Sequence, residues 1–193
     1  AFTEKFEVVG LSAHSNVDVL CRQIRRFRPR WVCVNDPRAM TQLAAQSYAR
    51  ACRLLNGKDE LAGVLKERGI DIVVMAISGA GALIPLLAAI ESGKDVALAN
   101  KEALVMAGEI VMAQARDRRA NIIPIDSEQS AIWQCLHGED QRKIQCVYLT
   151  ASGGPLYKRQ KKSFAHIGPQ EVLKHPRWKM GKKITVDSAT LMN

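Results

Sequence analysis

Two carboxylates flank a single hydroxyl residue at Asp126, Ser127 and Glu128, directly after an apolar run. If residues 121–125 form a strand, both acidic side chains lie on the same side, just past the carboxyl end of that strand. Open α/β sheets bind their ligands at this end of their strands. Two carboxylates placed together there either repel each other or share a cation. A metal site is therefore one of two interpretations of this spacing.

The other interpretation is a helix cap. The residues after Glu128 carry apolar side chains at helical spacing, so Asp126 or Ser127 could be the N-cap of that helix. Glu128 in the first turn would also interact favourably with the helix dipole. The apolar positions are Ala131, Ile132, Cys135 and Leu136. Capping explains the pattern without any ligand, whereas a metal site would need one. These residues alone do not decide between the two interpretations.

Other predicted strands also end in polar groups. Residues 95–99 are typical of a strand and are followed by Asn100, Lys101 and Glu102, which supply an amide, a cation and a carboxylate. The polar residues 12–16 lie between a predicted strand and a predicted helix. Exposed amides in such a segment can hold phosphate, although Asn16 is well suited simply to cap the helix.

The elements that must position these groups alternate along the chain. Strands are predicted at residues 6–11, 31–35, 70–76, 95–99 and 121–125. Helices are predicted at residues 17–26, from 38 onward, and at 60–68, 84–90 and 103–116. The run at 70–76 is typical of a central parallel strand buried on both faces. This alternation predicts an α/β fold with a doubly wound parallel sheet.

The sequence changes character after residue 139. Residues 144–150 alternate like a half-buried antiparallel strand, and residues 183–186 are predicted to form a last strand. Between them, residues 152–155 form a turn whose hydroxyl and backbone amides could hold an oxyanion. We therefore predict a first domain at residues 1–139 and the start of an α+β domain at residues 140–193.

The segment at residues 175–181 has two interpretations. It places Trp178 and Met180 between cationic side chains, as a mobile cover over a ligand would do. It is equally compatible with a surface loop that Trp178 anchors to the protein. Neither the aromatic nor the basic residues decide between them.

Composition narrows the range of partners. The formal net charge of +9 arises from clustered Lys and Arg residues and suits phosphates, nucleotides or nucleic acid. Three of the four clusters, at residues 25–30, 116–119 and 158–162, lack interleaved aromatic side chains for base stacking, so we interpret these three as solvated faces. The fourth cluster is Lys182 and Lys183. We expect no nucleic-acid partner. No apolar run reaches the roughly 20 residues of a membrane helix, and we expect no membrane partner. The five scattered cysteines predict buried thiols in a reducing compartment.

Six stretches, taken in order, carry a family resemblance along essentially the whole chain. They are residues 80–83 with 87–90, residues 98–102, residues 124–128, residues 152–155, His175-Pro176 with Trp178, Met180 and Gly181, and residues 186–190 with Met192-Asn193. Together they resemble the 1-deoxy-D-xylulose 5-phosphate reductoisomerase family of the non-mevalonate isoprenoid pathway. No single stretch is decisive, but six in sequence are highly specific.

The resemblance implies a Rossmann-like NADP domain followed by a catalytic domain. In the family, NADPH and a divalent metal, Mg²⁺ or Mn²⁺, act on a phosphorylated ketose. 1-Deoxy-D-xylulose 5-phosphate is rearranged to a branched aldehyde phosphate by retro-aldol cleavage and re-addition, and hydride from NADPH then gives 2-C-methyl-D-erythritol 4-phosphate. The resemblance also implies a homodimer, located in the bacterial cytoplasm or, in a photosynthetic eukaryote, in the plastid stroma.

The resemblance further implies a role for individual residues. Asp126 and Glu128 match metal ligands with a catalytic role, and Lys101 matches a catalytic cation beside the substrate. Matches to substrate contacts are Lys101, Ser127, Glu128, Ser152, His175, Ser188 and Asn193. Matches to cofactor contacts are His14, Ser15, Asn16, Asn100, Glu102 and Gly181. Trp178 and Met180 match a flap that closes over the substrate and excludes water.

Some features of the family pattern are expected outside this sequence. The Gly-rich phosphate loop is expected before Ala1. A third metal carboxylate, a phosphate-binding Lys and a helical C-terminal domain are expected after Asn193. Within the chain, His14 and Ser15 replace the glycine-lysine pair usual in the adenosine loop, and Leu191 stands where Met is usual. We therefore expect this chain alone to bind metal and cofactor poorly.

Two other functions compete with the reductoisomerase. A two-domain NADP oxidoreductase of the homoserine dehydrogenase type would use Lys101 without a metal, so its activity would persist in a strong chelator. A basic nucleic-acid-binding module would lose affinity steeply as salt increases. The second is the weaker alternative, because the cations do not line one recognition helix.

Overall fold

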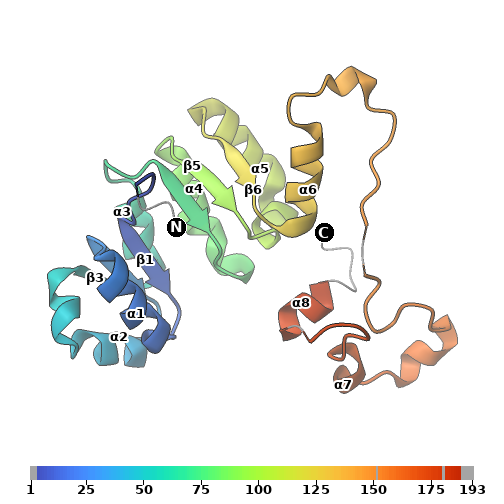
Figure 1. Cartoon of the computed structure of the whole chain (residues 1–193), viewed down its shortest axis with the longest axis horizontal. Coiled ribbons are helices and arrows are strands. Elements are labelled where there is room, and N and C mark those ends of the chain that lie inside the picture. The colour runs from blue at the N-terminus through green and yellow to red at the C-terminus, as the bar shows by residue number, and fades with distance from the viewer. Residues whose placement is uncertain (1–3, 151, 180, 188–193) are drawn as a thin grey trace. The chain divides into compact units, whose positions relative to one another are not determined.

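The computed structural model describes residues 4–150, 152–179 and 181–187 (Figure 1). The chain divides into two compact units, Ala1–Ile123 and Pro124–Asn193, which are described separately. The first unit alternates strands and helices, and the described part of the second consists of helices and extended segments. The domain boundary expected after residue 139 stays a prediction.

The strands and helices have the following bounds. The strands are β1 Gly10–Ala13, β2 Trp31–Val34, β3 Arg53–Asn56, β4 Ile72–Met75, β5 Asp95–Leu98 and β6 Ile122–Pro124. The helices of the first unit are α1 Val17–Phe27, α2 Pro37–Ala44, α3 Gly57–Leu65, α4 Leu83–Glu91 and α5 Glu102–Arg118, with short 3₁₀ turns η1 Ser47–Ala51 and η2 Gly79–Ala82. The second unit contains α6 Ser127–Leu136, η3 Gln141–Lys143, η4 Lys161–His166, α7 Pro169–Val172 and α8 Lys182–Asp187.

The strands form two three-stranded sheets, in the orders β1-β2-β3 and β4-β5-β6. β1 pairs with β2, β2 with β3 and β4 with β5, each in parallel. In register, Val32 lies opposite Leu54, and Val73 lies opposite Val96. The strands of both sheets alternate with helices along the chain, as do those of the two halves of a doubly wound fold. The predicted α/β fold class is confirmed.

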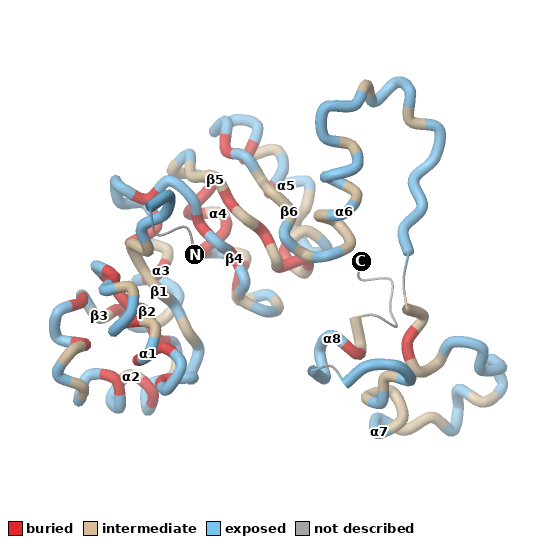
Figure 2. Tube along the Cα trace, in the orientation of Figure 1, coloured by how far each residue is buried: buried red, intermediate tan, exposed pale blue. Residues whose placement is uncertain are grey.

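One apolar core joins the two sheets. Leu55 of β3, Leu86 of α4 and Leu98 of β5 belong to the same buried cluster, which lies between the strands and α3 to α5 (Figure 2). A second cluster packs α1 against β2, because α1 presents one apolar stripe at helical spacing. That stripe consists of the four residues predicted to face inward, namely Val17, Leu20, Cys21 and Ile24.

The structure corrects several expectations for individual elements. β3 was not predicted, because Arg53–Asn56 is short, contains a charged residue and runs directly into Gly57. β4 is not buried on both faces: Ile72 is 47% and Val74 66% exposed. β4 is the edge of its sheet, and within the described residues only the face carrying Val73 and Met75 is covered.

Two further strands were predicted in the second unit, and neither forms in the described residues. Residues 144–150 are extended and have no pairing strand among the described residues, and all of them except the half-buried Ile144 are exposed (Figure 2). Alternation alone supplies no hydrogen-bonding partner. Residues 183–186 lie in helix α8 instead, where Lys183 pairs with Asp187 one turn later at 2.6 Å. A short apolar run does not distinguish helix from strand by periodicity.

The cysteine prediction is also only partly correct. Cys21, Cys33 and Cys52 are buried, whereas Cys135 and Cys146 are exposed. Burial raises the pKa of the Cys33 thiol to about 11, so Cys33 is an inert core residue. Among the described residues, no helix has both the length and the apolar character needed to cross a bilayer.

Candidate functional site

The loops after β4 and β5 are tied together by the side chain of Asn100. Its Nδ2 donates to the carbonyl of Ile77 at 2.6 Å and to that of Gly79 at 3.1 Å. Its Oδ1 accepts from the backbone N–H of Ala103 at 2.7 Å, at the start of α5. Asn100 is only 3% exposed, so these bonds are protected from water. Asn100 therefore fixes both loops at the carboxyl end of the sheet.

Lys101 and Glu102 lie beside this bridge. The Glu102 Oε1 accepts a hydrogen bond from the backbone N–H of Gly79 at 3.2 Å. Gly79 has a φ of 71°, in the left-handed region that favours glycine, and this hydrogen bond helps to hold it there. Lys101 is 8% exposed, an unusual degree of burial for an ammonium group. A cation in this low-dielectric position acts more strongly on a nearby oxyanion than it would in water.

The predicted adenosine loop lies at the carboxyl ends of β1 and β2. Asn35 Nδ2 donates to His14 Nδ1 at 3.2 Å, which pairs the two strand ends. Asn16 Oδ1 accepts from the N–H of Val19 at 3.1 Å, so Asn16 caps α1 as the sequence predicts. His14 and Ser15 are exposed. Asn35 was not singled out as a site residue, although it too directly follows a strand.

The carboxylate pair lies at the start of α6. Asp126 occupies the N-cap position, but its side chain makes no capping hydrogen bond to the helix. The Ser127 hydroxyl donates to Glu128 Oε2 at 2.8 Å, and both carboxylates are half-buried. The capping interpretation therefore does not account for the carboxylate of Asp126. Two carboxylates within one turn are oxygen donors of the kind that Mg²⁺ and Mn²⁺ prefer.

This pair is not a complete metal site by itself. The described residues contain no group of three or more His, Cys, Asp and Glu side chains that could hold a metal ion. Asp126 and Glu128 fit a hard cation in donor chemistry and would supply only part of its coordination shell.

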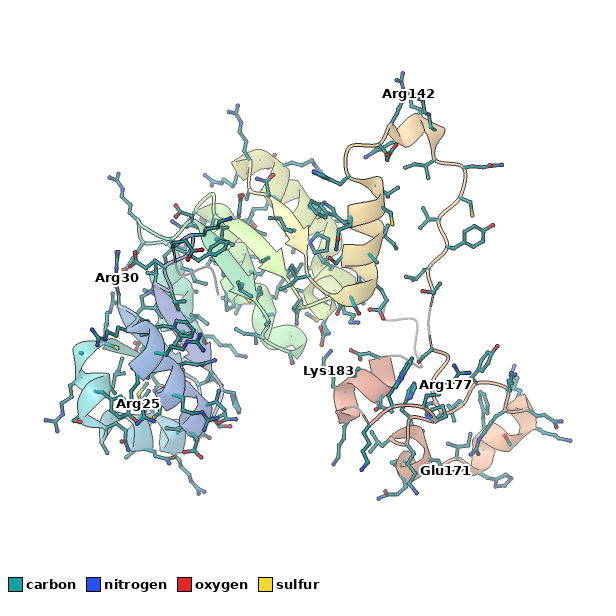
Figure 3. All side chains as sticks on the ribbon, viewed as in Figure 1. Arg25, Arg30, Arg142, Glu171, Arg177 and Lys183 are labelled. Carbon is teal, nitrogen blue, oxygen red and sulfur yellow. The ribbon has the colours of Figure 1, made fainter. Side chains whose placement is uncertain are left out.

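A second cluster in the same unit joins two segments that are 23 residues apart. His175 Nε2 lies 3.1 Å from Ser152 Oγ, so the turn at 152–155 contacts the start of the predicted flap. The His175 ring stacks on Trp178, with ring centroids 4.9 Å apart and an interplanar angle of 11°. Arg177 follows in the same segment (Figure 3). Trp178 is 55% exposed, so much of its indole remains available to a ligand.

Gly153 and Gly154 make the turn after Ser152 possible. Their φ angles are 77° and 61°, a left-handed conformation that favours glycine. A Cβ on Gly153 would lie 2.8 Å from the ring of Tyr157, closer than real Cβ contacts. The Gly154 N–H donates to Ser152 Oγ at 3.3 Å, so the turn also fixes the serine.

Gly153→Ala is expected to lower the stability of the full-length protein by about 1–3 kcal/mol, since it combines left-handed strain with the clash at Tyr157. The measurement is the midpoint of thermal unfolding. Gly63→Ala is the matched control, because Gly63 lies in α3 with open space around it. It should raise stability by up to about 1 kcal/mol. Equal effects of the two substitutions would contradict the strained turn.

The remaining predicted site residues are distributed as follows. Gly181 is exposed, and its carbonyl accepts from both the N–H and the hydroxyl of Thr185, at 3.0 and 3.1 Å. Met180, Ser188 and Asn193 lie outside the described residues. Within its units the structure thus brings together Asn100 with Glu102, Ser127 with Glu128, and Ser152 with His175 and Trp178.

The side chains of the basic clusters are exposed to solvent. Arg25, Arg30 and Arg142 are exposed (Figure 3). Arg30 pairs with Glu7 at 3.1 Å and Arg142 with Asp140 at 3.0 Å, on surfaces where such pairs add little stability. This exposure agrees with their interpretation as solvated faces.

Comparison with known families supplies the identification. Residues 1–108 match the family described as 1-deoxy-D-xylulose 5-phosphate reductoisomerase. The chain belongs to this family. Residues 122–193 match the family described as the 1-deoxy-D-xylulose 5-phosphate reductoisomerase C-terminal domain.

Curated relatives carry the same family name. The reductoisomerase of Caldanaerobacter subterraneus subsp. tengcongensis is 47% identical over 190 residues, which cover 98% of this chain and 49% of the relative. That of Thermodesulfovibrio yellowstonii is 44% identical over 192 residues, covering 100% of this chain and 50% of the relative. The chain therefore spans about half the length of the curated reductoisomerases it matches.

Solved reductoisomerase structures share the fold. A crystal structure of DOX-P reductoisomerase in complex with NADPH, fosmidomycin and magnesium superimposes with a TM-score of 0.83 at 34% identity, covering 97% of this chain and 49% of that one. The Zymomonas mobilis reductoisomerase in complex with NADPH gives a TM-score of 0.82 at 32% identity, covering 96% and 48%.

Proposed function

We propose that the full-length protein carrying this chain is an NADPH- and divalent-metal-dependent reductoisomerase that converts 1-deoxy-D-xylulose 5-phosphate to 2-C-methyl-D-erythritol 4-phosphate in the non-mevalonate isoprenoid pathway. The observation that carries the proposal is the match of residues 1–108 and 122–193 to the two family segments. The candidate catalytic residues Lys101, Asp126 and Glu128 lie inside these two segments. The family match and the local geometry therefore support the same activity.

Asp126 and Glu128 are the residues that would hold the metal. The Asp126 carboxylate is not used to cap α6, and the Glu128 carboxylate is oriented by the Ser127 hydroxyl at 2.8 Å. A bound Mg²⁺ or Mn²⁺ would supply Lewis-acid polarisation of the substrate's carbonyl and hydroxyl oxygens. Lys101 would add a buried positive charge for the oxygen that becomes negative as the carbon skeleton rearranges.

NADPH is the proposed cofactor, and it would supply hydride to the rearranged aldehyde. The proposed contacts are His14, Ser15, Asn16, Asn100, Glu102 and Gly181. His14 is exposed at the carboxyl end of β1, where doubly wound sheets bind nucleotides. Asn16 and Asn100 are already engaged in capping α1 and in joining two loops. Their contribution would therefore be to hold backbone amides and carbonyls in place for the cofactor.

The proposed contacts of the phosphorylated ketose are Lys101, Ser127, Glu128, Ser152, His175, Ser188 and Asn193. Short hydroxyl and amide donors suit a phosphate dianion. Trp178 and Met180 would cover the bound substrate and exclude water, which strengthens electrostatic interactions in the site. A homodimer in the bacterial cytoplasm or the plastid stroma completes the proposal.

The proposal is tested by whether NADPH oxidation requires both the substrate and a divalent metal. The full-length protein should consume NADPH, followed by its absorbance, only when 1-deoxy-D-xylulose 5-phosphate and Mg²⁺ or Mn²⁺ are present. Removing the metal with a strong chelator should lower the rate by more than about 100-fold, and adding back either metal should restore it. Undiminished NADPH oxidation in chelator would instead favour a metal-independent oxidoreductase of the homoserine dehydrogenase type.

A further inference from the structure

An open cavity of about 350 Å³ lies in the first unit, where the end of α1 meets η1. Its volume is within the range of pockets that bind small molecules. Two of its lining residues, Pro29 and Cys52, lead directly into β2 and β3, so the cavity lies at the amino ends of these strands. The candidate site residues of this unit lie in loops that follow strands, at their carboxyl ends. The proposed function therefore makes no use of this cavity.

The lining of the cavity combines an apolar part with a cationic part. Its apolar residues are Ile24, Pro29, Ala51 and Cys52, of which all but Ala51 are buried. Its cationic residues are Arg25 and Arg28, and both are exposed. None of the described residues that line the cavity carries a carboxylate. This lining suits an anionic group that is attached to an apolar body.

The guanidinium group of Arg25 is held at the cavity by Tyr48. Its central carbon lies 5.2 Å from the centroid of the Tyr48 ring, and both residues line the cavity (Figure 3). This distance is that of a cation–π contact, which uses the face of the guanidinium group. The N–H donors lie in the plane of the group, so the stacked side chain can still donate to an oxyanion.

Arg28 reaches the cavity from a strained backbone position. It is the C-cap of α1, with φ of 48° and ψ of 56°, a left-handed conformation that glycine adopts more easily than any other residue. The cap uses only the backbone, since the Arg28 N–H donates to the carbonyl of Ile24 at 2.8 Å. Its side chain lines the cavity instead. An arginine at a position where glycine would cap equally well indicates a role for the guanidinium group.

We propose that this cavity is a binding site for a phosphate monoester with a small apolar body. Arg25 and Arg28 would donate to the phosphate oxygens, which their planar N–H groups match in geometry. The carboxyl end of α1 carries a partial negative charge, so without these two cations the cavity would repel the phosphate. Within the basic cluster at residues 25–30, this assigns Arg25 and Arg28 to a site, whereas Arg30 pairs with Glu7 on the surface.

The probe is phenyl phosphate, whose ring and phosphate match the two parts of the lining. Its binding to the full-length protein is measured by isothermal titration calorimetry. The decisive variant is Arg28→Gly, because glycine suits the left-handed cap and the substitution removes only the guanidinium side chain. The matched control is Arg119→Gly. Arg119 is the exposed C-cap of α5 with φ of 55°, and it does not line the cavity.

The unaltered protein should bind phenyl phosphate with Kd on the order of 1 mM or below. Arg28→Gly should raise Kd at least ~10-fold, because it removes a charge-assisted contact at the negative end of a helix. Arg119→Gly should match the unaltered protein in Kd. Neither substitution should lower the thermal midpoint, since each relieves a left-handed residue. Inorganic phosphate should bind at least ~10-fold more weakly than phenyl phosphate, because it leaves the apolar lining uncovered.

A second variant tests the cavity without altering an arginine. Ala51→Glu places a carboxylate on an exposed lining residue, and it should raise Kd for phenyl phosphate at least ~10-fold by repelling the phosphate. Equal binding by the unaltered protein, Arg28→Gly and Ala51→Glu would place phenyl phosphate elsewhere and overturn the proposal, as would no binding at all. The titration needs no turnover, so a lack of reductoisomerase activity would reject the proposed function and leave this result standing.

Discussion

Asp126→Asn in the full-length protein is expected to lower kcat/KM for 1-deoxy-D-xylulose 5-phosphate by ~10³-fold or more. An amide of the same shape keeps one neutral oxygen but removes the negative charge that a divalent cation needs. Asp126 lies at the N-cap of α6 without capping it, so the substitution removes no helix hydrogen bond. The loss should therefore appear in activity and in metal affinity, and not in the capping of α6.

Glu128→Gln should behave in the same way, since Glu128 is the second carboxylate of the pair and accepts from Ser127. Both variants should need a higher Mn²⁺ concentration for half-maximal activity than the unaltered protein. Asp140→Asn is the matched control, because Asp140 is a carboxylate of the same unit that pairs only locally with Arg142. If Asp126→Asn retained full, metal-dependent activity, this carboxylate pair would not be the metal site.

The fold of the first unit is largely predictable because its elements are periodic. The stripe of Val17, Leu20, Cys21 and Ile24 has the helical period, and its burial follows directly. β3 could not be predicted in the same way, because Leu54 and Leu55 are a short apolar pair beside a turn. β3 forms because it pairs with β2, which is a tertiary interaction and not a local one.

The second unit is less predictable for the same physical reason. Residues 144–150 have the alternation of a strand, but a strand needs a neighbour for its backbone groups. Residues 183–186 form part of α8 because Gly181 accepts from Thr185 and Lys183 pairs with Asp187. These local contacts favour a helix over a strand for this segment. They cannot be inferred from its pattern of apolar residues.

For the candidate site, too, some features could be predicted from the sequence and others could not. Polar residues directly after predicted strands could be found from sequence, and Asn100, Lys101, Glu102, Asp126 and Glu128 were found in that way. The contact between His175 and Ser152 could not, because nothing in either segment specifies which residue 23 positions away it meets. Nor could the sequence show that the amide of Asn100 bridges two loops.

Asn100→Ala is expected to lower the free energy of unfolding of the full-length protein by about 3–5 kcal/mol and to raise KM for NADPH. The substitution leaves the carbonyls of Ile77 and Gly79 and the N–H of Ala103 without the partner that satisfies them. Each buried group that loses its hydrogen bond costs about 1–3 kcal/mol. The effect is measured by chemical denaturation, with the steady-state KM determined on the same preparation.

Asn121→Ala is the control, since Asn121 also bonds through Nδ2, to Asp95 at 3.0 Å, but is exposed. It should change stability by less than about 0.5 kcal/mol. The pair of measurements also separates two roles for Asn100. A scaffold that holds the loops after β4 and β5 must lose stability when its amide is removed, and cofactor affinity falls as a consequence. A rise in KM for NADPH with unchanged stability would show instead that Asn100 leaves its buried position to contact the cofactor directly.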